Sequence, residues 1–278
     1  MKKRKLRKNI KVFLIAGGVL VAVILGLLIA ISRKSRLQEA SDLETSTPVP
    51  SASATPEQHE PYEFSKADLA EIRDELRRDR IINGDVKAIL AFPSGLVHEP
   101  VLQGPDNTKY LYEDWKTGDS LSYGSITMDY ENDLDQDDMN TIIYGHYIYE
   151  FRNEDRSLVF TPLALLQEEE NYEANRYVAL VTEKDIRYYE VASVYDCPMV
   201  DVENGQVTEE DLQFNLVTYD PDYFQTYLNA VKQHQYYDTG IAIQSSDHLL
   251  SLQTCIEEKP ESREIVLCRE VDRVFFTD

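Results

Sequence analysis

The chain has 278 residues, of which 42% are hydrophobic, and this is enough for one sizeable folded domain with shorter appendages. Ten of its 28 Lys and Arg residues lie within the first 36 positions, which contain no Asp or Glu. The remainder carries 18 basic against 50 acidic residues, a net charge of −32. Such an acidic body excludes non-specific binding to nucleic acid or to an anionic membrane surface.

The first appendage is an apolar run of 20 residues at positions 12–31, about the length that crosses a bilayer. Seven basic residues precede it and three follow it, which favours a cytoplasmic tail at residues 1–11 and an extracellular body. No A-x-A cleavage pattern directly follows the run, so we interpret it as an uncleaved signal-anchor rather than a signal peptide. The sequence therefore predicts a single-pass protein of the cell membrane.

Residues 32–61 are expected to be a disordered extracellular linker, since this stretch is rich in Ser, Thr, Pro, Ala and Glu and lacks aromatic residues. The folded domain is predicted at residues 62–278. It begins with a helix at Ser65, which forms a capping-box-like pair with Asp68.

The rest of the domain is mainly β. Short runs rich in β-branched and aromatic residues alternate with turn formers, which is typical of strands. Eight such runs fit a closed antiparallel barrel better than a parallel sheet, because few helices lie between them. The expected strands are residues 86–92, 97–102, 125–128, 141–144, 177–182, 187–195, 248–254 and 264–271.

Two helices are expected to interrupt these strands. A Thr-Pro pair at 161–162 begins one that runs to about residue 171, and an Asp-Pro pair at 220–221 begins a longer one to about residue 235. The acidic stretch 129–138 does not fit a calcium-binding EF-hand loop, because neither register places Gly at position six and Glu at position twelve. We interpret it as a solvated loop.

Three polar residues each stand at the end of an apolar strand, where a barrel exposes side chains on a rigid support. They are Cys255 after LLSLQT, His146 after NTIIYG, and Arg263 before EIVLC. Taken singly, each has a plain alternative: a buried inert thiol, a turn histidine and a solvated arginine. Cys197 and Cys268 lie inside apolar runs and are expected to be small buried residues.

Several motifs, in one order along residues 65–271, make the chain similar to the class B sortases. They are P-V-L-Q at 100–103, D-N at 106–107, Y-L at 110–111, G-S-I-T-M-D at 124–129, I-I-Y-G-H at 142–146, Y-D-T-G at 237–240 and S-L-Q-T-C at 251–255. The family's usual T-L-x-T-C has Thr where this chain has Ser251. Two further departures are Lys87-Ala88 in place of Gly-Trp, and Tyr147 in place of Asn.

This resemblance implies a sortase-type eight-stranded closed β-barrel and a cysteine transpeptidase. Carried over to this chain, Cys255 is the nucleophile, His146 the general acid and base, and Arg263 the group that stabilises the oxyanion or the substrate. Thr254 is expected to contact the substrate. No metal and no cofactor are expected.

The arginine could be Arg263 or Arg269, which are six residues apart and so face the same side of a strand. Cys255 ends one strand and the next returns antiparallel, so the residue level with Cys255 lies at the start of the returning strand. We therefore predict Arg263. His248 would lie about 20 Å from Cys255 along its strand, too far to act on the thiol.

The resemblance also implies the partners. The donor is a surface protein or pilin bearing a C-terminal sorting signal of the L-P-x-T-G or N-P-x-T-N type, cut after Thr. The acceptor is the amine of a peptidoglycan cross-bridge, or a pilin lysine in a pilus-polymerising member, and the sequence does not separate the two. A non-catalytic tethered binding module and a peptidase that uses water are the remaining alternatives.

Overall fold

The computed structural model describes residues 60–277 except for 137, 150–156, 199–213 and 257–261. The predicted anchor at 12–31 and most of the predicted linker lie outside the described residues. Within the part of the chain that is described, no helix combines the length and apolar character needed to span a bilayer.

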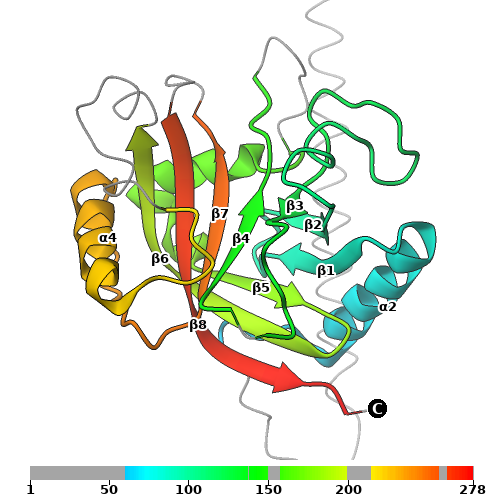
Figure 1. Ribbon diagram of the computed structural model, residues 1–278. Helices are drawn as coiled ribbons and strands as arrows, with labels where there is room; N and C mark the ends of the chain where they lie inside the picture. The colour runs from blue at the N-terminus through cyan, green and yellow to red at the C-terminus, as the bar shows by residue number, and fades with distance from the viewer. Residues whose placement is uncertain (1–59, 137, 150–156, 199–213, 257–261, 278) are drawn as a thin grey trace, which may run out of the picture. The chain divides into compact units, whose positions relative to one another are not determined.

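Figure 1 shows a β-barrel flanked by the helices α2 (Lys66–Ile82) and α4 (Pro221–His234). Three 3-10 segments lie between β4 and β5, namely η1 (Thr161–Gln167), η2 (Glu169–Asn171) and η3 (Glu173–Asn175). The strands are β1 (Val86–Ala91), β2 (His98–Leu102), β3 (Thr127–Met128), β4 (Asn140–Tyr144), β5 (Tyr177–Val181), β6 (Asp185–Pro198), β7 (Leu249–Cys255) and β8 (Ser262–Phe275).

The eight strands close in the order β1-β2-β3-β4-β7-β8-β6-β5, with β5 pairing back onto β1. The predicted closed eight-stranded barrel is therefore confirmed, and the expected antiparallel pairing holds for six of its eight strand pairs. The pairs β2·β3 and β4·β7 are parallel. Parallel neighbours need a long crossover, and the chain between β4 and β7 provides it with the 3-10 segments, β5, β6 and α4.

Both α-helices begin at the caps that the sequence indicates. The Ser65 hydroxyl accepts from the Asp68 amide (3.2 Å), and the Asp220 carboxylate accepts from the Asp222 amide (2.8 Å). The helix expected at 161–171 is instead made of 3-10 turns, η1 and η2. Pro162 lies at the start of η1 as expected, but the backbone bonds there span three residues, as from the Leu163 amide to the Phe160 carbonyl (3.1 Å).

Three apolar clusters hold the domain together. The largest fills the barrel interior and includes Leu252 of β7 and Val266 of β8, both 0% exposed. A second lies between α2 and the barrel, and a third lies between α4 and the outer face of β6, β7 and β8. The outer face of β7 and β8 is thus covered by α4 over part of its length, and the strand ends beyond it are left for a site.

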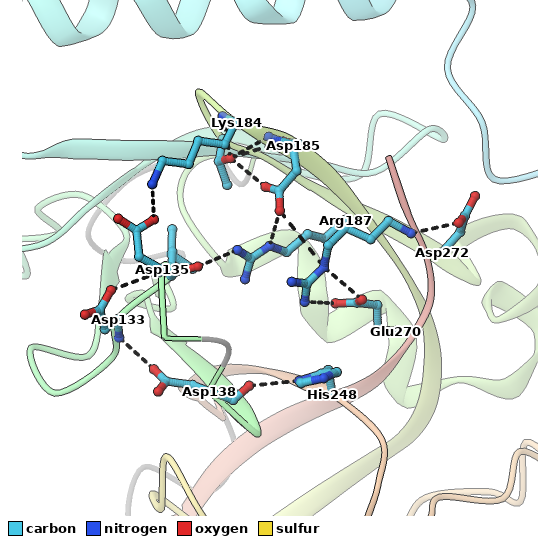
Figure 2. A network of polar contacts seen from close by, with 12 residues as sticks. Asp133, Asp135, Asp138, Lys184, Asp185, Arg187, His248, Glu270 and Asp272 are labelled. Carbon is cyan, nitrogen blue, oxygen red and sulfur yellow. Dashed lines mark hydrogen bonds and ion pairs between the residues drawn. The ribbon is translucent and has the colours of Figure 1, made fainter. Parts of the chain in front are cut away.

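The acidic stretch 129–138 is a loop, as expected, and Figure 2 shows the polar contacts that fix it. Arg187 donates to the Leu134 carbonyl (2.6 Å) and to Asp185 (3.1 Å), and Lys184 pairs with Asp135 (2.7 Å). The Asp138 carbonyl lies 3.2 Å from His248 Nδ1. Because His248 immediately precedes β7, this network lies about 20 Å along the strand from Cys255.

Candidate active site

Cys255 and Arg263 are directly opposite one another on neighbouring strands. Cys255 is the last residue of β7 and pairs with Arg263, the second residue of β8, while Arg269 pairs with Leu249 at the far end of β7. The register predicted from the sequence is therefore confirmed. Directly opposed antiparallel residues have Cβ atoms about 4.5–5.5 Å apart and project to the same face, so the thiol and the guanidinium share one side of the sheet.

His146 reaches the same place from the other side of β7. β4 runs parallel to β7 with Tyr144 level with Gln253, and the Gly145 amide donates to the Gln253 carbonyl (3.0 Å). Continuing this register by two residues brings His146 level with Cys255. The three candidate catalytic residues thus come from the ends of three adjacent strands, β4, β7 and β8.

Gly145 allows the chain to pass close to Phe160 and Ile126 at this point. A Cβ added there would come within 2.7 Å of the Phe160 ring and 3.0 Å of Ile126. The Phe160 amide donates to the His146 carbonyl (3.3 Å), and the Ile148 amide donates to the Thr161 hydroxyl (2.9 Å). The segment that carries His146 is therefore packed closely against the start of η1.

A pocket of about 210 Å³ opens where these residues meet, and it holds all three of them. Cys255, His146 and Arg263 are each half-buried, so each is accessible to a ligand without being fully solvated. The remaining wall comes from Leu111, Tyr112, Tyr144, Gly145, Phe214, Asn215, Gln253 and Thr254. The arrangement can place a carbonyl carbon against the thiol with an imidazole and a guanidinium on either side, which is what acyl transfer requires.

Thr254 also borders the pocket, but its side chain is 2% exposed. It lies on the face of β7 that carries Leu250 and Leu252 into the barrel interior. Its hydroxyl is thus turned inward, and a substrate contact by Thr254 stays a prediction.

The sequence did not single out Tyr112, whose ring centroid lies 5.2 Å from that of His146. Tyr112 is 53% exposed at the pocket wall. It directly follows the Tyr-Leu motif at 110–111, which is the signal that could have drawn attention to it. An exposed tyrosine beside the imidazole can limit the approach of water to it.

Asp129, which ends the G-S-I-T-M-D motif, connects the D-N motif at 106–107 to the I-I-Y-G-H motif at 142–146 behind the pocket. Its carboxylate accepts from the Tyr144 hydroxyl (2.7 Å) and from the Asn107 side-chain amide (2.8 Å). Burial, followed by the hydrogen bond and charge of Asp129, raises the pKa of Tyr144, which therefore stays protonated and keeps donating. This network ties the loop before β3 to the end of β4, next to His146.

The other two thiols are structural. Cys197 and Cys268 are 2% and 0% exposed, and all three cysteines are free. Burial, reinforced by the neighbouring Asp196, raises the pKa of the Cys197 thiol to about 12, and burial alone raises that of Cys268. Thiols held protonated in this way are poor nucleophiles.

A larger cavity, of about 600 Å³, lies beside the acidic loop. Its described wall includes Arg80, Lys87 and Lys184 but neither a cysteine nor a histidine, so it lacks a nucleophile paired with a base. Among the described residues, no group of three or more His, Cys, Asp or Glu side chains is placed to hold a metal ion. Acyl-transfer chemistry is therefore supported at the smaller pocket.

The known proteins to which this chain is similar are sortases B. The chain is 27% identical over 198 residues to sortase B of Listeria monocytogenes, covering 68% of this chain and 70% of that one. It is also similar to the X-ray structure of Clostridium perfringens sortase B, with 28% identity, a TM-score of 0.58, and coverage of 70% of this chain and 99% of that one.

A Staphylococcus aureus sortase B–substrate complex has the same fold, with 21% identity, a TM-score of 0.59, and coverage of 74% of this chain and 89% of that one. No protein-family model matches the chain. The motifs, the closed barrel and these similarities together support a class B sortase and, with it, a cysteine transpeptidase.

Proposed function

We propose that this transpeptidase cleaves a C-terminal sorting signal of the L-P-x-T-G or N-P-x-T-N type after Thr and transfers the protein to an amine of the cell wall. The observation that carries the proposal is the convergence of Cys255, His146 and Arg263 on one pocket at the ends of three neighbouring strands. A nucleophile, a proton carrier and a cationic donor are the groups that this reaction needs.

In the first half-reaction, the Cys255 thiolate attacks the Thr carbonyl carbon, and the charge that develops on the carbonyl oxygen is stabilised by the Arg263 guanidinium. The C–N bond then breaks, and the leaving amine takes a proton from the His146 imidazolium. The product is a thioester between the Thr carbonyl and Cys255.

In the second half-reaction, an incoming amine attacks the thioester and loses its proton to His146. The S–C bond breaks and the thiolate is regenerated, so no water is consumed. One solved sortase B is complexed with triglycine, and a free amine of that kind fits the proposed acceptor.

The proposed location is the outer face of the cell membrane. The apolar run 12–31, its flanking basic residues and the linker 32–61 support an anchored domain that faces the cell wall.

The test is product analysis. The full chain in detergent is incubated with L-P-x-T-G and N-P-x-T-N peptides, with and without triglycine. We expect a peptide–triglycine adduct that disappears in Cys255→Ala. Hydrolysis that is indifferent to the added amine would support a peptidase instead, and a triglycine adduct that persists in Cys255→Ala would contradict the assigned nucleophile.

A further inference from the structure

Glu264 is a buried carboxyl directly beneath the candidate active site. It lies on β8 next to Arg263, is 0% exposed, and projects to the interior face that carries Val266. Its Oε2 accepts from the Gln167 side-chain amide at 2.6 Å, while its Oε1 has no hydrogen-bond partner among the described residues. Burying a carboxyl so deeply is costly, which calls for a reason.

Other polar groups face Glu264 from each neighbouring element. Thr254 of β7 and Asp196 of β6 are its register partners on the two sides of β8. The Thr254 hydroxyl is also buried and has no hydrogen-bond partner within the described part of the chain. Tyr237, which follows α4, donates to the Leu166 carbonyl (2.7 Å), one residue before Gln167.

Burial is the main cause that raises the pKa of Glu264 to about 7, and Asp196 raises it further while the Gln167 hydrogen bond opposes the shift. The carboxyl is consequently neutral in mildly acidic solution and ionises at slightly alkaline pH. Burial and the neighbouring Tyr172 and Glu264 raise the pKa of Tyr237, so that group does not titrate in the same range.

The segment η1 connects this carboxyl to His146. At its start, Phe160 and Thr161 contact the His146 segment through the two hydrogen bonds already described. At its end, Gln167 binds Glu264. The residue before Phe160, Val159, has φ 46°, a left-handed conformation that is strained for a β-branched side chain and persists only where surrounding contacts enforce it.

We propose that Glu264 is a positioning residue: through Gln167 it fixes η1 against β8 and thereby fixes His146 relative to Arg263 across the pocket. The inference rests on the proposed function of that pocket. The bond between Glu264 and Gln167 joins the strand that carries the guanidinium to the segment that packs on the imidazole. Ionisation of Glu264 beside Asp196 would place a charge in the interior and loosen the packing there, a cost that the Gln167 hydrogen bond, which favours the ionised form, offsets only in part.

The test uses the full chain and compares Glu264→Leu, Glu264→Gln and Gln167→Leu. In Glu264→Leu, the leucine removes the hydrogen bond and the buried carboxyl together with little change in buried volume, so folding is retained. We expect kcat/KM to fall about tenfold or more in each Leu variant, mainly through kcat, and the double variant to lose little beyond either single one. Glu264→Gln keeps an acceptor for Gln167 and should restore most of the activity.

Two further readouts separate positioning from a general structural effect. The ratio of kcat/KM in Glu264→Gln to that in the wild type should rise as the pH passes about 7, since only the wild type ionises there. Glu190→Gln is the matched control, because Glu190 is a buried glutamate (5% exposed) that pairs with Arg176 and Arg269, away from the pocket. The ratio of kcat/KM in Glu190→Gln to that in the wild type should not change over this pH range.

A readout without substrate makes the outcome independent of the proposed function. The pH profile of Cys255 alkylation by iodoacetamide reports the imidazole next to the thiol, and it should shift in both Leu variants. If both Leu variants keep kcat/KM within about twofold of the wild type and leave the alkylation profile unchanged, the inference is overturned. If the wild type turns over no sorting-signal peptide but the alkylation profile still shifts, the positioning role stands and the proposed function fails.

Discussion

Cys255 and Arg263 pair directly across β7 and β8, as the last residue of one strand and the second residue of the next. The backbone hydrogen bonds between the two strands, rather than a loop, thus fix the backbone positions of the two residues. A donor held on a rigid strand can be aimed at the place where charge develops during attack on a carbonyl, which makes such donors effective.

Replacing Arg263 by Ala should lower kcat/KM by about 100-fold or more, in the range found when an oxyanion donor is removed. Arg269→Ala is the control, because Arg269 lies six residues away and binds Glu190 (3.1 Å) and the Ala242 carbonyl (3.0 Å). It should lose about 1 kcal/mol of stability and little activity. Steady-state kinetics with a sorting-signal peptide tests this, and a larger loss in Arg269→Ala would refute the assignment.

Only one of the three thiols should react in the folded protein. Cys255 is half-buried at the pocket, whereas Cys197 and Cys268 are buried and their pKa values are raised. Mass spectrometry after iodoacetamide treatment should therefore find one modified cysteine in native protein and three after denaturation. Cys255→Ser should remain unmodified when native; fast labelling of Cys197 would contradict the burial described here.

Gly145→Ala should displace the segment that carries His146. The added methyl group would lie 2.7 Å from the Phe160 ring, which cannot move freely because it is 0% exposed in the core. We expect a loss of about 1–3 kcal/mol of stability and a fall in kcat. Gly84→Ala is the matched control, since nothing lies within 4 Å of its added Cβ; equal effects of the two substitutions would argue against close packing at Gly145.

Much of the barrel could be predicted because its strands are short apolar runs between turn formers. Each of the eight expected runs overlaps an observed strand, and the Arg263 register followed from simple antiparallel geometry. The relative direction of neighbouring strands was harder to predict from the sequence. The β4·β7 pair is parallel because a long crossover separates two strands that are adjacent in space, and no local pattern encodes that adjacency.

The interior support of the site could not be predicted from the sequence. Glu264 opens the run EIVLC, where a charged residue normally indicates solvent, and the carboxyl is buried only because β7, β6 and η1 surround it. Gln167 lies 97 positions away and has no local feature that links it to Glu264. The 3-10 form of η1 was missed for a similar reason, because its Thr-Pro start is equally typical of an α-helix.

Glu264 should make the folded protein less stable as the pH rises from mildly acidic to neutral. Its pKa rises from an ordinary 4.5 to about 7 on folding, so the native state binds more protons between these values and stability falls as the pH increases across them. Above pH 7 the penalty levels off at up to about 3 kcal/mol. The Glu264→Gln variant has no carboxyl to ionise and so lacks this penalty. It should be more stable than the wild type at pH 8 and about as stable as the wild type at pH 4.

Urea unfolding at several pH values measures this difference. The control Glu190→Gln should behave in the opposite way at pH 8, losing stability because it breaks ion pairs with Arg176 and Arg269. If the free energies of unfolding of the wild type and of Glu264→Gln differ by the same amount at every pH, Glu264 does not titrate in this range.

The most direct test of the central claim is the mass of the acyl-enzyme. The full chain is mixed with a sorting-signal peptide in the absence of amine, quenched in acid and digested. We expect a peptide acylated at Cys255 through the Thr carbonyl, strongly reduced in His146→Ala and Arg263→Ala, and released when triglycine is added before the quench. Acylation at another residue, or amine-dependent product formed without any Cys255 adduct, would contradict it.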